Sequence, residues 1–217
     1  MDSSPNTPFE ALFGVPAPGA DAVATPMEMD AVGKICDFCG PALGSDDPAV
    51  WAYPCGQTSQ QFDIGGTGRT MDIPLAAGLW YACARCHRYI KGNGWAALAK
   101  SIGFADGHAG PPAWQSFRVA REKGPGYRWP LDPNAVPALR PTIRTAWAYL
   151  STAAVQPDHR ETVAKIKLIA ELCGTLYATV PTEDDVKFLR EYVGPYLVPS
   201  LQIHLGRSLK FALYAAP

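Results

Sequence analysis

The chain has 217 residues, of which 47% are hydrophobic and 18% charged, and its formal net charge is −1. This size and composition can bury a real core, which excludes an intrinsically disordered protein, and the near-zero charge excludes a chain that is basic throughout. The charges are unevenly spread: residues 1–84 carry two basic and ten acidic residues, whereas residues 85–150 carry ten basic and three acidic ones. The chain therefore has an acidic front and a basic middle.

Residues 1–30 are predicted to form a disordered tail, in which Phe9, Leu12 and Phe13 have the spacing of one helical turn. Such a segment either docks in a partner's groove or remains an idle tail. The tail has no basic n-region, and no stretch of the chain reaches the ~18 apolar residues of a membrane span. We expect a cytoplasmic protein without membrane association, whose six cysteines are metal ligands or buried thiols rather than disulfides.

Two Cys-x-x-Cys motifs mark the next segment, Cys36 and Cys39 in "CDFCG" and Cys83 and Cys86 in "CARCH". A single Cys-x-x-Cys-His could attach a c-type haem, but the second pair and the absence of an export signal argue against it. Two pairs that face each other complete the four-thiolate shell that a structural Zn²⁺ prefers. We predict a zinc site formed by these four cysteines.

Short strands are predicted between the two motifs, in "AVWAYPC", "QQFDI" and "TMDIPL". Residues 31–103 are therefore predicted to form a zinc-ribbon-like β module, in which Gly40 supplies a positive φ after the first pair. Cys55 is expected to be a small buried residue rather than a fifth ligand. His87 could replace a thiolate, orient one, or cap a helix that starts near Tyr89, and the capping role is favoured.

Two resemblances bear on this module. The two cysteine pairs and "CARCHRYIK" resemble the zinc-binding half of HNH endonucleases, which would leave Asp63 and His87 as remnants of a nuclease site. However, no histidine lies between Cys39 and Cys83 to act as the general base. "CDFCG", "WAYPC" and "WYACARCHRYIKGNGWAALAK" also resemble a four-cysteine cassette of small actinobacterial and actinophage proteins, which implies metal binding and no particular activity.

Residues 104–141 are rich in Pro and Gly and interleave basic with aromatic residues. They are either a connector or a nucleic-acid contact, because cations can follow a phosphate backbone while rings stack on bases. The candidate residues for such a contact are Arg118, Arg121, Lys123, Arg128 and Trp129.

Residues 142–217 are predicted to form a helical bundle, with the helical pattern running from Pro141 onward, which makes the whole protein α+β. Ile143, Trp147 and Leu150 begin an apolar stripe, and a second stripe runs from Val163 through "AKIKLIAELCGTLY", with Cys173 in its core. Thr182 is a predicted N-cap before three acidic residues, and a last stripe consists of Leu201, Leu205, Leu209 and Leu213.

The combined prediction is a non-enzymatic, zinc-stabilised binding protein of phage or actinobacterial type. It would act as a regulator or adaptor on nucleic acid or on a host protein. A degenerate HNH-like nuclease is the alternative, and a structural or assembly component remains open because apolar helix faces could build a homo-oligomer.

Overall fold

The computed structural model describes residues 35–40, 48–63, 70–75, 77–108, 110–121 and 126–216. The predicted tail at residues 1–30, the turn "GGTGRT" except its last residue, and Lys123 lie outside the described residues.

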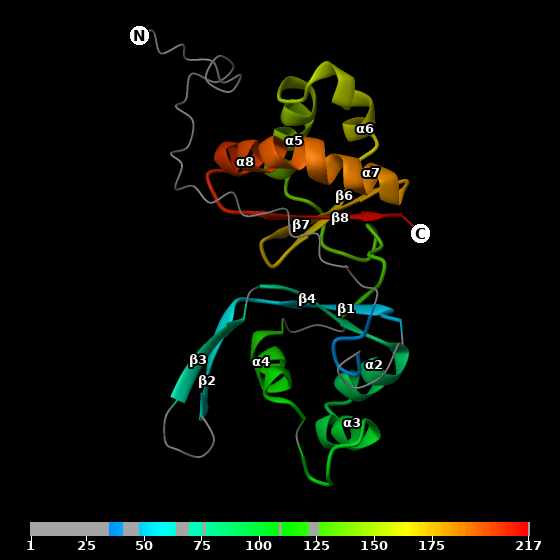
Figure 1. The fold of residues 1–217 in the computed structure, drawn as a ribbon, viewed down its shortest axis with the longest axis vertical. Coiled ribbons are helices and arrows are strands. Elements are labelled where there is room, and N and C mark those ends of the chain that lie inside the picture. The colour runs from blue at the N-terminus through cyan, green and yellow to red at the C-terminus, as the bar shows by residue number, and fades with distance from the viewer. Residues whose placement is uncertain are drawn as a thin grey trace.

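The first half of the chain folds around an antiparallel sheet of strand order β4-β1-β5, and a separate β2-β3 hairpin extends to one side of it (Figure 1). The predicted strands are confirmed, and the segment predicted as a connector contributes a helix and a short strand. In chain order the elements are β1 (Trp51–Cys55), β2 (Thr58–Asp63), β3 (Thr70–Leu75), β4 (Gly78–Ala82), α2 (Ala84–Lys91), α3 (Trp95–Ser101), α4 (Pro112–Ala120) and β5 (Tyr127–Arg128).

The second half contains helices and a three-stranded sheet of order β6-β7-β8, in which β7 pairs antiparallel with β6 and parallel with β8. The α+β class is thus confirmed, whereas a purely helical bundle over residues 142–217 is wrong. The elements are α5 (Pro141–Ala153), η2 (Pro157–His159), α6 (Arg160–Ala164), β6 (Lys167–Leu172), β7 (Thr175–Val180), α7 (Glu183–Phe188), the π-helical turn η3 (Leu189–Val193), α8 (Gly194–Leu205) and β8 (Lys210–Ala215).

The segment "AKIKLIAELCGTLY" forms the β6-β7 hairpin rather than the predicted helix. Its apolar residues fit a helical stripe, but they also alternate from Ile166 to Leu172, which is the period of a strand. Cys173 and Gly174 have φ values of 49° and 74°. Two consecutive positive φ angles suit a tight hairpin turn, so Cys173 is a partly exposed turn residue and not a core position.

The last predicted leucine stripe is divided between a helix and a strand. Gly206, with a φ of 63°, ends α8 in the left-handed conformation typical of a helix C-terminus. Leu201 and Leu205 therefore belong to α8, Leu209 lies in the connection, and Leu213 belongs to β8.

Two predicted helix starts are confirmed. The helix α5 begins at Pro141, and the Thr182 hydroxyl accepts a hydrogen bond from the Asp185 amide at 3.0 Å at the start of α7. Within the described residues, no helix is long and apolar enough to cross a membrane.

The two sheets lie face to face, with α5, α6, α7 and α8 beyond one sheet and α2, α3 and α4 beyond the other (Figure 1). The layer between the sheets contains Ala52 of β1, Leu79 and Tyr81 of β4, and Tyr177 and Tyr214 of the second sheet. The opposite face of the first sheet carries Trp51, Tyr53 and Cys55 of β1, with Trp80 and Ala82 of β4. Because successive strand residues point to opposite faces, this sheet packs against a different hydrophobic core on each of its two faces.

Trp129 joins the two sheets, because its ring lies 5.0 Å from the ring of Tyr81 and 4.7 Å from that of Tyr214, centroid to centroid. We expect Trp129→Ala to lower the free energy of unfolding by about 2–3 kcal/mol, since a large ring is lost from a partly buried position. Tyr149→Ala is the control, because Tyr149 is 51% exposed on α5. Denaturant unfolding should leave this control within ~0.5 kcal/mol of the native protein. Equal stability of Trp129→Ala and the native protein would contradict this role.

Candidate metal centre

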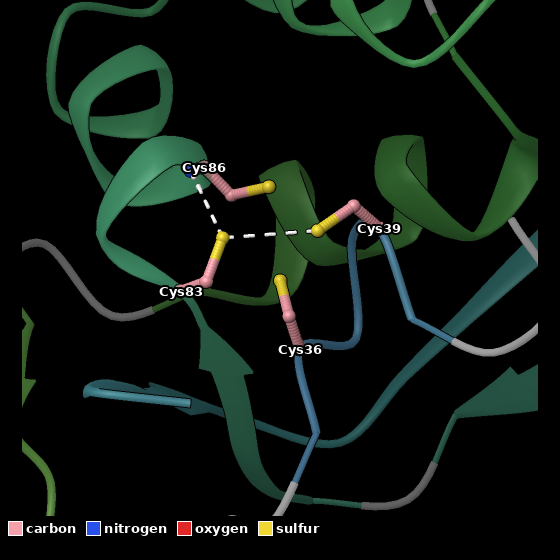
Figure 2. Close-up of side chains that lie close together, drawn as sticks. All are labelled: Cys36, Cys39, Cys83 and Cys86. Atoms are coloured by element: carbon pink, nitrogen blue, oxygen red, sulfur yellow. Dashed lines mark hydrogen bonds between the residues drawn. The ribbon is translucent and has the colours of Figure 1, made fainter. Parts of the chain in front are cut away.

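The four predicted cysteine ligands converge in the structure, and their Sγ atoms lie within 4.8 Å of one another (Figure 2). The Sγ atoms of Cys39 and Cys83 are 3.7 Å apart. A disulfide would need about 2.05 Å. Sulfurs at about 2.3 Å from a tetrahedrally bound Zn²⁺ would be about 3.8 Å apart. All four residues are buried, and the cluster can therefore hold one metal ion out of contact with solvent.

The first pair lies on a tight turn that is fastened to β4. The Asp37 amide donates to the Tyr81 carbonyl at 2.8 Å, and the Tyr81 amide donates to the Asp37 carboxylate at 2.6 Å. Gly40 is not among the glycines with positive φ, contrary to the prediction. A Cβ at this position would lie 2.4 Å from the Cys36 carbonyl oxygen, so glycine is needed here for close backbone approach.

The second pair lies at the corner between β4 and α2. Cys83 is the N-cap of α2, and its Sγ accepts a hydrogen bond from the Cys86 amide at 3.4 Å. The helix thus begins at Ala84 and not near Tyr89 as predicted, and its N-terminus favours negative charge on sulfur. A zinc-ribbon-like arrangement is not confirmed, because this pair lies on a helix start rather than on a second hairpin turn.

An aromatic shell surrounds the four sulfurs. Phe38, fully buried between the two cysteines of the first turn, lies 4.9 Å from Phe117 and 5.9 Å from Trp114, measured between ring centroids. Trp80 and Trp95 complete the shell around Phe38. Trp114 and Phe117 come from α4, inside the segment predicted as a connector. These two rings are therefore core residues and are not available to stack on bases.

Burial and mutual contact perturb the thiols. The Cys86 thiol donates a hydrogen bond to Cys36, which lowers the pKa of Cys36 to about 5. The same hydrogen bond, followed by burial, raises the pKa of Cys86, and burial raises the pKa of Cys83 to about 11. These shifts favour a thiolate on Cys36 and thiols on Cys83 and Cys86 in the metal-free cluster. Only a bound cation can make the full set of thiolates favourable.

His87 and Cys55 are outside this cluster. The His87 Nδ1 atom lies 2.6 Å from the Tyr53 hydroxyl, and the ring stacks on Trp51 with a centroid distance of 3.7 Å and an interplanar angle of 3°. Burial, then the nearby charges of Lys91 and Arg128, lower the pKa of His87. Cys55 is buried at the end of β1, where its backbone forms an isolated antiparallel β-bridge with Arg121. His87 is thus a packing residue next to the centre, and neither residue joins the four-sulfur set.

The predicted nucleic-acid residues have different environments. Arg118 and Arg128 are exposed, and each guanidinium carbon lies 5.4 Å from a ring centroid, over Trp95 and Trp51 respectively. Arg121 is partly buried, and its charge acts on Tyr53. Trp129, the candidate stacking residue, packs between the sheets against Tyr81 and Tyr214. The sequence pattern placed Trp51 in a predicted strand but did not mark it as a candidate binding residue.

Asp63, the predicted remnant of a nuclease site, ends β2, but its side chain lies outside the described residues. A scan against protein-family models and searches of the curated proteins and of the solved structures find no match to this chain. The function is therefore inferred from the geometry of the centre and its surroundings.

Cys86→Ser should abolish stoichiometric metal binding and leave the protein largely insoluble, because metal-binding energy is also folding energy at such a centre. Elemental analysis of purified protein and the soluble yield measure both effects. Cys55→Ser is the matched control, since Cys55 is equally buried but outside the cluster. It should keep its metal and lose about 1–2 kcal/mol of stability at most. A soluble, metal-free and folded Cys86→Ser protein would contradict the metal centre.

Proposed function

We propose that the four cysteines bind one structural Zn²⁺. Four thiolates are soft donors, and a compact four-sulfur set favours zinc over the hard cations Mg²⁺ and Ca²⁺. The buried set offers four protein ligands and leaves no position for a bound water, which is the arrangement of a structural and not a catalytic zinc. The ion would join the turn at Cys36, the end of β4 and the start of α2.

We further propose that the protein is a non-enzymatic nucleic-acid-binding protein, acting as a regulator or adaptor. The observation that carries this proposal is the charge of the helices around the centre: α2, α3 and α4 contain no aspartate or glutamate. These helices lie together on the outer side of the first sheet (Figure 1). They contribute five cations, of which Lys100 pairs with Asp106 at 2.8 Å: Arg85, Arg88, Lys91, Lys100 and Arg118. Helices with this excess of positive charge are complementary to a phosphate backbone.

Two further observations favour binding over catalysis and over self-assembly. The Nδ1 atom of His87 is engaged by Tyr53 and its ring by Trp51, so this histidine is poorly placed to activate water. The apolar faces of α5, α7 and α8 are buried against the second sheet, where they form one core with it. These helix faces therefore do not need a second copy of the chain to cover them.

Zinc binding should release at least two protons near neutral pH, because Cys83 and Cys86 are thiols in the metal-free cluster and must bind as thiolates. The apparent affinity should accordingly rise with pH, by roughly 100-fold per pH unit for two protons. Competition with a chromophoric chelator between about pH 6 and pH 8 measures this slope. Cys173→Ser, in the β6-β7 turn, should leave it unchanged, and an affinity independent of pH would contradict thiolate ligation.

The proposed function predicts salt-dependent binding to nucleic acid without cleavage. Zinc-loaded protein should bind labelled oligonucleotides at low ionic strength, with affinity falling steeply as salt rises because neutralised phosphates release counterions. The same samples, incubated with Mg²⁺ or Mn²⁺, should remain uncut on gels. Failure to bind any nucleic acid at low salt would contradict this function and leave binding to a protein partner as the remaining hypothesis. Cleavage that is lost in Asp63→Ala and His87→Ala would instead support the nuclease.

A further inference from the structure

A column of three side chains lies on the basic side of the first sheet. The His87 ring supports one face of Trp51 at 3.7 Å, and the Arg128 guanidinium lies over the Trp51 ring at 5.4 Å. The strand register explains this arrangement, because Trp51 of β1 is directly opposite Arg128 of β5. Trp51 is partly exposed, and Arg128 is exposed at the outer end of the column.

Cations that have no carboxylate partner among the described residues lie on α2 beside His87. Lys91 lies one helical turn after His87 on α2 and is exposed, as is Arg88. Within the described part of the chain, no ion pair includes Arg88, Lys91 or Arg128, whereas Lys165 and Arg207 pair with carboxylates in the second half. The positive charge around Trp51 is therefore available to a ligand.

The His87 ring, on which Trp51 stacks, is held in a fixed orientation. The Tyr53 hydroxyl, 2.6 Å from His87 Nδ1, fixes the orientation of the histidine ring. His87 also follows Cys86 directly, so the metal centre fixes the backbone from which the ring extends. No carboxylate among the described residues restrains Arg128 in the same way, so its guanidinium can turn away from the ring when a planar ligand arrives.

We propose that Trp51, Arg128 and Lys91 form a nucleotide position for single-stranded nucleic acid. An unpaired base stacks on the face of Trp51 that Arg128 covers, once the guanidinium has turned aside, and the flanking phosphates pair with Arg128 and Lys91. A duplex hides its base faces in the helical stack, so this position discriminates single strands from duplex. The inference rests on the proposed function, since it names the form of nucleic acid that the basic face binds.

The second cation–ring pair among the described residues does not offer a site for a base. Arg118 lies over Trp95 at the same distance of 5.4 Å, but Trp95 is only 7% exposed and belongs to the aromatic shell of the metal centre. A base cannot reach the face of this ring without unpacking that shell. The geometry therefore favours Trp51 over Trp95 as the stacking residue.

The test compares full-length, zinc-loaded protein with its variants in fluorescence anisotropy titrations. The probes are a labelled oligothymidine of about 15 nucleotides and a duplex of the same length. Trp51→Leu, which keeps an apolar side chain but removes the stacking surface, should weaken single-strand binding by about 10-fold, and Trp51→Phe should recover part of the loss. Arg128→Gln and Lys91→Gln should each weaken binding and reduce the log–log salt slope by about 0.7.

Arg144→Gln is the matched control, because Arg144 is an exposed arginine on α5, in the helix layer beyond the second sheet. It should leave the affinity and the salt slope unchanged. Zinc content and melting temperature verify that each variant is folded, and the Arg128 and Lys91 variants decide the matter if Trp51→Leu does not fold.

The outcomes separate the two proposals. Equal affinity for the single strand and the duplex, with no effect of Trp51→Leu, would overturn the nucleotide position while leaving salt-dependent nucleic-acid binding intact. Unchanged salt slopes in both Arg128→Gln and Lys91→Gln would also overturn it, because the phosphates would then be bound elsewhere. No salt-dependent binding to either probe would overturn the proposed function and this inference together.

Discussion

The ionisation of four thiols within a dry aromatic core is the constraint on which this structure depends. Burial and contact keep Cys83 and Cys86 protonated while Cys36 carries the charge, so the sulfurs cannot all be thiolates unless a cation neutralises them. The chain segments that meet here are held mainly through these sulfurs and through Phe38, which is fully buried among rings from several helices and strands. Metal binding at this cluster would therefore be coupled to folding of the first half.

The centre acts on its surroundings through β1. This strand is central in its sheet, so its residues alternate between the metal-centre core on one face and the layer between the two sheets on the other. Tyr53 and Trp51 face the metal centre and contact His87, whereas Ala52 faces the second sheet. Loss of the metal would thus disturb the Trp51 column directly, and the packing between the sheets only through the backbone of β1.

The sequence predicted the structure correctly where a local pattern allowed only one interpretation. The two Cys-x-x-Cys pairs, the short strands between them, the proline start of α5 and the Thr182 cap each have a single good interpretation. It was insufficient where two periods fitted the same residues, as in the β6-β7 hairpin, which only the Cys173-Gly174 turn could have distinguished from a helix. It also could not show that α4, in a Pro- and Gly-rich segment, supplies Trp114 and Phe117 to the metal centre, because that packing is tertiary.

The same alternation accounts for the position of Arg128. Tyr127 and Trp129, its two neighbours, pack into the layer between the sheets, so Arg128 must point to the opposite face, which is the face of Trp51 and the metal centre. The second half of the chain therefore contributes to the proposed nucleotide position without touching it, because Tyr214 and Tyr81 hold Trp129 in place. A surface whose stacking ring is held in place before the ligand arrives loses little conformational entropy on binding. A closed metal centre of the proposed kind would suit this role, because it would give rigidity to the binding surface.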